Sequence, residues 1–186
     1  MAADALKLLM ETDALVKDWE EKRSKILAQF ESIGNINTQL DSLKKCEVRG
    51  SLGVLSSFSS VCVRLKGKLL LSQERAIAFI DRDQKLMEKI VKDLLHKKRE
   101  AEKIWRKMAE KDGVDVLSKR SEESFSVSDW LQWIKELSCL VYANWKTMAP
   151  ITYPLTESMI NAWNKELYGV EEITSFIAYT VQESKK

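Results

Sequence analysis

Apolar residues recur every three or four positions along several long stretches of the chain, the spacing of one face of an α-helix. From about Ala3 to Cys46 this pattern predicts a long helix with a heptad seam, and we expect Gly34 within it to mark a kink or a close helix contact. The seam positions are Val16, Trp19, Ile26, Phe30, Ile33 and Leu40. A second long helix is predicted from about Leu69 to Lys111, ended by Gly113. The two are expected to pack as an elongated, coiled-coil-like antiparallel hairpin.

Glycines and serines interrupt the pattern between the two predicted helices. Gly50, Gly53 and five serines from Ser51 to Ser60 form the clearest break in the first half of the chain. Periodicity does not separate helix from strand between Val54 and Leu65, and we favour a short helix there. The segment 50–66 is therefore expected to join the arms of the hairpin.

The last third of the chain contains the start and stop signals of several shorter helices. A polar, Ser-rich stretch ends where Ser126 and Asp129 resemble a capping box, which predicts a helix from about Val127 to Ala149. Pro154 is expected to open a helix that runs to about Tyr168 and is stopped by Gly169, and a last helix is predicted over 170–183. We therefore expect a hairpin over 1–117, a flexible loop over 118–127 and a compact C-terminal helical bundle over 128–186, packed on the hairpin as one structural domain.

Composition supports an all-α fold. The 186 residues include 6 glycines and 2 prolines, far fewer chain breakers than a sandwich or barrel with a turn every few residues requires. Lys and Arg total 30 against 28 Asp and Glu, so a formal net charge of +2 does not by itself point to nucleic acid or a membrane. No apolar run approaches the length of a membrane span, and no secretory leader is visible. Three widely spaced cysteines favour a reducing compartment, and we expect the cytoplasm and nucleus.

Motifs for catalysis are not evident in the sequence. The single histidine, His96, lies among lysines and an arginine on a charged helix and is expected to be a solvated surface residue. Neither a Walker loop nor a GxGxxG motif occurs. The carboxylates lie close to Lys or Arg, as in solvated helix pairs. We therefore expect no enzymatic activity, no cofactor and no metal.

Two groups of residues are candidate interaction surfaces. The candidate basic patch consists of Lys97, Lys98, Arg99, Lys103, Arg106 and Lys107. The candidate partner surface consists of Leu131, Lys135, Tyr142 and Lys146, which should project away from a tryptophan-rich face of the same helix. That opposite face carries Trp130, Trp133 and Trp145, which we expect to form an aromatic core together with Trp163.

The order of elements and several short motifs resemble the AIRIM family, the AAA-ATPase-interacting ribosome maturation factors. The motifs are Gly113-Val114-Asp115-Val116-Leu117, the run Ser128-Asp129-Trp130-Leu131-Gln132-Trp133-Ile134-Lys135-Glu136-Leu137, and Ala162-Trp163-Asn164-Lys165. The resemblance implies a non-enzymatic adaptor that pairs with a CINP-like helical subunit and docks on AAA unfoldases of the Afg, spermatogenesis-associated type. It also implies a role in releasing a shuttling assembly factor from cytoplasmic pre-60S ribosomal particles, and in replisome protein turnover.

Two other functions remain open at the level of sequence. The hairpin could serve as a coiled-coil scaffold subunit of a chromosome or cytoskeletal complex, since heptad patterns fit pairing within one chain or with a partner. The basic run Lys97–Lys107 could instead make the chain an RNA-binding helical module.

Overall fold

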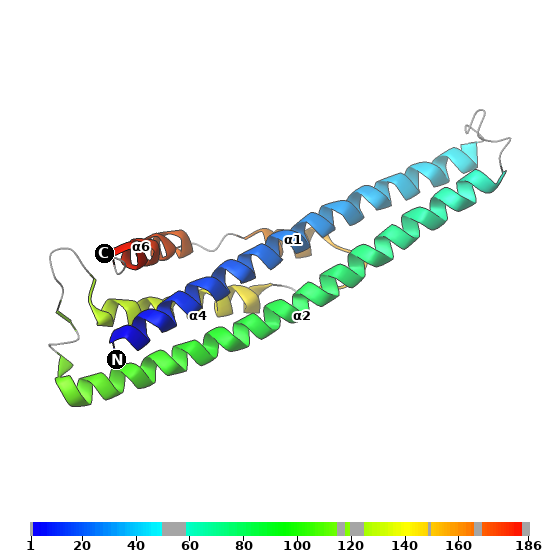
Figure 1. Cartoon of the computed structure of the whole chain (residues 1–186). Helices are drawn as coiled ribbons and strands as arrows, with labels where there is room; N and C mark the ends of the chain where they lie inside the picture. The colour runs from blue at the N-terminus through cyan, green and yellow to red at the C-terminus, as the bar shows by residue number, and fades with distance from the viewer. Residues whose placement is uncertain are drawn as a thin grey trace. The chain divides into compact units, whose positions relative to one another are not determined.

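A computed structural model describes residues 2–49, 59–114, 118–119, 125–148, 150–165 and 169–183. Over these residues the regular secondary structure is helical (Figure 1). The helices are α1 (Ala2–Arg49), α2 (Ser59–Asp112), α4 (Val127–Thr147), α5 (Glu157–Asn164) and α6 (Val170–Glu183). The predicted all-α fold, with two long helices and a helical C-terminal part, is confirmed.

The chain divides into two compact units. One consists of Met1–Glu21 and Met87–Lys186, and the other of Lys22–Leu86. Both long helices contribute to both units, so this division crosses the helices themselves. The domain ranges expected from the sequence stay a prediction.

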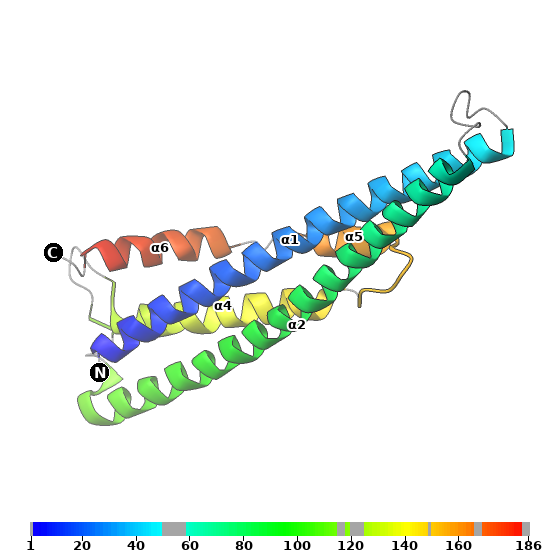
Figure 2. The ribbon, with the colours of Figure 1, turned by 45° about the vertical axis from the view of Figure 1, so that its right-hand side comes forward.

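The Lys22–Leu86 unit is built from the second part of α1 and the first part of α2, which run antiparallel (Figure 2). Its buried apolar side chains recur at helical spacing. They are Ile26, Phe30, Ile33, Ile36, Cys62, Ala76 and Ile80. Near the seam the Gln73 side-chain amide donates a hydrogen bond to Asn37 Oδ1 over 2.8 Å. Of the expected seam positions in this unit, Ile26, Phe30 and Ile33 are buried, whereas Leu40 is only half-buried.

Gly34 does not make the close helix contact expected for it. Helix α1 runs from Ala2 to Arg49 as one element, and no neighbouring atom lies within 4 Å of the position that a Cβ on Gly34 would take. The hydrogen bond from Thr38 Oγ1 to the Gly34 carbonyl, 3.0 Å long, remains within the helix. Gly34 is therefore an exposed helical position and not a point of close contact.

In the larger unit, α4 lies between α2 and α6 (Figures 1 and 2). The buried Ser138 hydroxyl lies 3.0 Å from the Leu94 carbonyl of α2 and 2.7 Å from the Ile134 carbonyl of its own helix. Leu137 and Val141 are buried beside it on α4. The hydroxyl is thus within hydrogen-bond distance of a carbonyl on each helix, which marks a close approach of α4 to α2.

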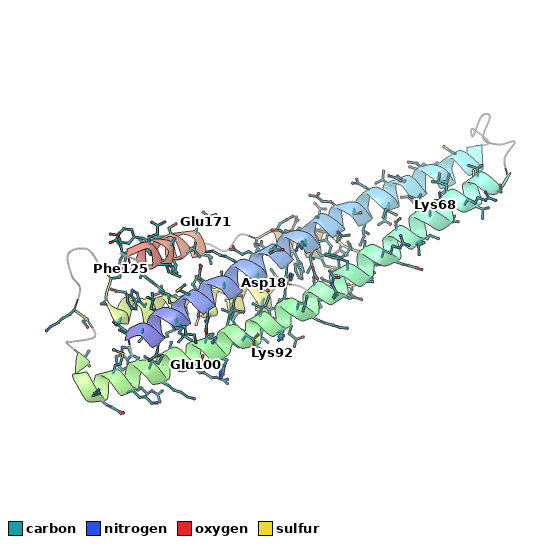
Figure 3. The ribbon with its side chains drawn as sticks, in the orientation of Figure 1. Asp18, Lys68, Lys92, Glu100, Phe125 and Glu171 are labelled. Atoms are coloured by element: carbon teal, nitrogen blue, oxygen red, sulfur yellow. The ribbon has the colours of Figure 1, made fainter. Side chains whose placement is uncertain are left out.

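Four aromatic rings connect the start of α4 with α6. Phe125 packs at 4.8 Å from Trp133 and 5.5 Å from Phe176, measured between ring centroids, and Trp133 stacks on Phe176 at 5.7 Å. Tyr179 lies edge-on to Phe125 at 6.3 Å. Figure 3 labels Phe125 beside α6. Phe176 remains 37% exposed although it contacts two of these rings.

The start of α2 was predicted incorrectly. The helix begins at Ser59 and continues without a break to Asp112, so residues 59–65 are its first turns and not a separate short helix before Leu69. Residues 50–58, with Gly50 and Gly53, lie outside the described residues. The serines and valines of 59–63 join α2 because neither type ends a helix, and Gly67 is accommodated inside it.

The boundaries near the two prolines also differ from the prediction. Helix α5 begins at Glu157 after the N-cap Thr156, whose side chain accepts a hydrogen bond from the Met159 amide, so Pro154 precedes the helix and does not open it. Gly169, with φ of 85°, leads into α6, and its carbonyl accepts a hydrogen bond from the Ile173 amide. Gly169 therefore directly precedes α6 and does not stop α5, whose last residue is Asn164. At the end of α2, Gly113 has φ of 81° and donates to the Ala109 carbonyl, as predicted.

The capping box at the start of α4 is present as predicted. Asp129 N lies 3.2 Å from Ser126 Oγ, and Ser126 N lies 2.8 Å from Asp129 Oδ2. Ser126→Ala should lower the free energy of unfolding by about 1 kcal/mol, because it leaves a helix-end amide without its acceptor. Urea denaturation of the full chain measures this, and Ser128→Ala, in the first turn of the same helix, is the matched control. Equal losses from both substitutions would contradict the capping role.

Candidate functional site

A groove of about 340 Å³ lies between α2 and α4 in the larger unit. Its residues recur at helical spacing on both walls, which places them on facing sides of two antiparallel helices. On α2 they are Ala101, Glu102, Trp105 and Arg106, and on α4 they are Ser128, Leu131, Gln132 and Lys135. The groove thus contains members of both candidate surfaces, which are separate in the sequence.

The floor of the groove is apolar and its rim is exposed. Ala101 and Leu131 are buried, with 2% and 4% of their surfaces accessible. Trp105 is 40% exposed, the largest side chain in the groove and accessible at its edge. An accessible indole beside a small apolar floor is the arrangement that recurs where a partner inserts an apolar anchor.

The rim has more positive than negative charge. Arg106 and Lys135 stand on opposite walls and both are exposed, while Glu102 is half-buried. Within the described part of the chain, neither cation has a carboxylate at ion-pair distance. Lys103 and Lys107 are exposed on the same stretch of α2. The groove is therefore suited to an apolar residue flanked by acidic ones.

The candidate basic patch does not form one continuous surface. Lys97 is only 22% exposed at its side chain and pairs with Glu11 at 2.6 Å and Glu100 at 3.2 Å. Lys98 is half-buried, with its ammonium 3.4 Å from Cys139 Sγ on α4. These two lysines are engaged in contacts within the larger unit, whereas Arg99, Lys103, Arg106 and Lys107 are exposed. The expected run of six available cations is thus reduced to four.

The candidate partner surface is also divided. Leu131 was expected to project outward, but it is buried in the groove floor because α2 covers that side of α4. Tyr142 is 38% exposed, and the Lys146 ammonium lies 5.6 Å from the centre of its ring. Lys135 is exposed on the groove rim. The tryptophan face is partly buried: Trp133 and Trp163 are buried, whereas Trp130 and Trp145 are half-buried.

Trp105 is the site residue that sequence reasoning missed. It lies between the buried residues Ala101 and Met108 on a helix crowded with charge, so its pattern was that of an ordinary surface position. The available signal was a large aromatic residue off the apolar stripe, with Arg106 and Lys107 immediately after it. Only the pairing of α2 with α4 brings it opposite Leu131 and Lys135.

The ion pair between Lys97 and Glu11 joins α2 to the start of α1 within the larger unit. The hydrogen bond from Lys97 holds the pKa of the Glu11 carboxyl below its ordinary value, although partial burial acts in the opposite direction. The same hydrogen bond raises the pKa of Lys97, and again partial burial opposes it. Both shifts favour the charged pair near neutral pH.

A double-mutant cycle should detect this pair. With Glu11→Gln and Lys97→Met we expect a coupling of about 0.5 kcal/mol at pH 7, since the Glu11 side chain remains 42% exposed and water screens the interaction. Because the folded pKa of Glu11 is lowered, the coupling should be present above the unfolded value near 4.3 and lost as pH falls through the folded pKa. Urea denaturation at neutral and acidic pH measures it. A coupling that stays constant as Glu11 protonates would contradict the assignment.

The other candidate groups carry no recognisable chemistry. His96 is exposed, as predicted, with Nε2 at 3.5 Å from Glu100 Oε1. The three cysteines are free, and Cys62 is buried. Among the described residues, no three His, Cys, Asp or Glu side chains gather as a metal site would require. None of the helices in the described ranges has an apolar stretch long enough to cross a bilayer.

Comparison with known proteins places most of the chain in one family. Residues 7–145 match the family model described as CA109-like, ribosome biogenesis protein C1orf109-like. This stretch covers about three-quarters of the sequence and includes both walls of the groove. The match confirms the resemblance drawn from the sequence motifs. No curated protein matches the sequence.

Proposed function

Because this chain belongs to the C1orf109-like family of ribosome biogenesis proteins, we propose that it is a non-enzymatic adaptor subunit of an AAA ATPase complex. In this proposal it works in the nucleus and cytoplasm on maturing pre-60S particles, where the complex releases a shuttling assembly factor. A CINP-like helical subunit belongs to the same complex, which also acts in replisome protein turnover. The ATPase supplies the mechanical work, and this chain positions it.

The observation that carries the proposal is the groove between α2 and α4. Trp105 offers an accessible indole over the buried Leu131, and Arg106 and Lys135 flank it with positive charge. Such a site binds an exposed segment of another protein through one apolar anchor and acidic neighbours. We assign the anchor to the ATPase.

Two features distinguish this function from RNA binding. Lys97 and Lys98 are engaged with Glu11 and Cys139, which leaves fewer cations for a phosphate backbone than the sequence offers. Glu100 and Glu102 interrupt the remaining cations along α2. An RNA-binding surface gains most of its affinity from uninterrupted contacts with phosphates.

Affinity purification of the endogenous chain tests the proposal. The expected result is an AAA hexamer together with pre-60S particles, retained when the salt concentration is raised moderately. A stoichiometric set of other coiled-coil proteins without an ATPase would favour a scaffold. RNA that dissociates steeply with salt, again without an ATPase, would favour an RNA-binding module. Hydrolysis of ATP by the purified chain alone would contradict the non-enzymatic assignment.

A further inference from the structure

A second apolar surface lies in the Lys22–Leu86 unit, on the first turns of α2. Val63 is 71% exposed, Leu70 42% and Leu71 46%. Together with Gly67 they follow helical spacing, so they share one side of α2, and we name these four residues the α2 stripe. The buried positions Cys62, Ala76 and Ile80 belong to the adjacent seam. The α2 stripe is therefore a face that the seam of this unit leaves uncovered.

Gly67 is an unusual residue at the centre of this face. A glycine inside a helix is less favourable than alanine, and here its conformation is helical and not one that requires glycine. No neighbouring atom lies within 4 Å of the position that its Cβ would take. The unit itself therefore gives no packing reason for glycine. A missing side chain between Val63 and Leu70 leaves a notch in which another backbone can approach closely.

The charges around the α2 stripe have one sign. Between Ser59 and Gln73 the chain has Arg64, Lys66 and Lys68 and no acidic residue, and the first carboxylate is Glu74. All three cations are exposed, and Figure 3 labels Lys68 on this segment. In the described residues none of the three has an ion-pair partner. Leucines bordered by unpaired cations are complementary to a surface of apolar and acidic residues.

We infer that the α2 stripe is the docking site for an amphipathic, acidic helix of another protein, which crosses α2 closely at Gly67. The apolar residues of that helix cover Val63, Leu70 and Leu71, and its flanking Asp or Glu residues pair with Arg64 and Lys66. A helix is the element that fits, because a continuous helical face with a notch receives a second helix by packing of ridges into grooves. This surface lies in a different unit from the groove and does not depend on the proposed function.

Two other occupants of the α2 stripe, a second copy of the chain and a membrane surface, are less complementary to its charges and to the notch at Gly67. A second copy of the chain that packed stripe against stripe would bring Arg64, Lys66 and Lys68 to an interface with the same cations. An anionic membrane surface would accept the charges, but it does not explain the notch at Gly67, since lipid does not require a close backbone approach. The experiment separates all three.

The probe is a synthetic helical peptide of about three heptads, with leucines along one face and glutamates beside them, and a twin with lysines in place of the glutamates. Fluorescence anisotropy measures binding to the full chain. Gly67→Gln is the decisive variant, because it should raise the melting temperature and yet obstruct the notch. Leu70→Glu replaces an apolar side chain of the α2 stripe with a negative charge, which should repel an acidic helix. Leu86→Glu is the matched control, since Leu86 is 40% exposed on the same helix and about 160° around it from Leu70.

The expected result is binding of the acidic peptide, with the lysine twin at least about tenfold weaker. Gly67→Gln and Leu70→Glu should each weaken binding at least about tenfold, and Leu86→Glu should leave it within about twofold. No binding of the acidic peptide, or equal binding of its twin, would overturn the inference. So would sedimentation of the chain as a dimer that Leu70→Glu dissociates, or flotation with phosphatidylserine vesicles that Leu70→Glu abolishes.

Discussion

Replacing Trp105 by alanine is expected to weaken binding of this chain to the proposed AAA ATPase partner by at least about 30-fold, the effect of losing about 2 kcal/mol at an interface anchor. The indole is 40% exposed at the groove edge and offers the largest apolar surface there. The free energy of unfolding should change by no more than about 1 kcal/mol, because much of the ring already contacts water. Surface plasmon resonance with the purified ATPase and urea denaturation measure the two quantities.

Tyr179→Ala is the matched control for this substitution. Tyr179 is an aromatic residue of similar exposure, 46%, and it lies on α6 in the same unit. It should leave affinity for the ATPase within about twofold. Unchanged binding of Trp105→Ala, or equal loss in both variants, would show that the groove between α2 and α4 is not the docking site.

Leu137→Ala should have the largest effect on stability, lowering the free energy of unfolding by about 2–5 kcal/mol. Leu137 is fully buried on α4, next to Ser138, whose hydroxyl bonds to the Leu94 carbonyl of α2. The loss combines the apolar transfer free energy with the cavity left between rigid helices. Calorimetry or urea denaturation of the full chain measures it.

The substitutions at Trp105 and Leu137 should have opposite effects on binding and on stability. Leu137→Ala should destabilise the fold strongly and affect the ATPase only through the fraction of unfolded chain, whereas Trp105→Ala should affect binding with little change in stability. Leu140→Ala is the control for Leu137, because Leu140 is only half-buried on the same helix. A loss at Leu137 no larger than the loss at Leu140 would contradict the position of α4 in the core.

Much of the helical architecture followed from local pattern. The spacing of Val16, Trp19, Ile26 and Phe30 predicted a buried seam, and the pair Ser126 and Asp129 predicted the start of α4 to the residue. Both signals are encoded within one or two helical turns, where periodicity and capping chemistry determine the outcome. They needed no knowledge of the rest of the chain.

The errors fall where the outcome depends on a neighbouring element. Leu131 has the spacing of an outward residue on α4, but α2 covers it. In the sequence Lys97 belongs to a basic run, but in the structure it pairs with Glu11, which is far away along the chain. Trp105 has no signal of its own within α2, and its importance comes from the opposite wall of the groove. Helix pairing is a tertiary property, which a local pattern does not contain.

The start of α2 was missed for a local reason. Glycines and serines from Gly50 to Ser60 predicted an interruption, and periodicity did not separate helix from strand between Val54 and Leu65, so the predicted helix began only at about Leu69. In the structure the helix begins at Ser59 and places Val63 and Gly67 on its exposed side. The same short segment therefore contains both weak helix formers and exposed apolar residues. This is what we expect of a helix face that another protein covers.

The most direct test of the adaptor account is the fate of the shuttling assembly factor in cells whose only copy of this chain has Arg106→Glu and Lys135→Glu. Reversing both groove cations should repel an acidic anchor while leaving the helices intact. The account predicts that the factor accumulates on cytoplasmic pre-60S particles, although the variant is present at normal abundance. Normal return of the factor to the nucleus, with the variant no longer bound to the ATPase, would contradict it.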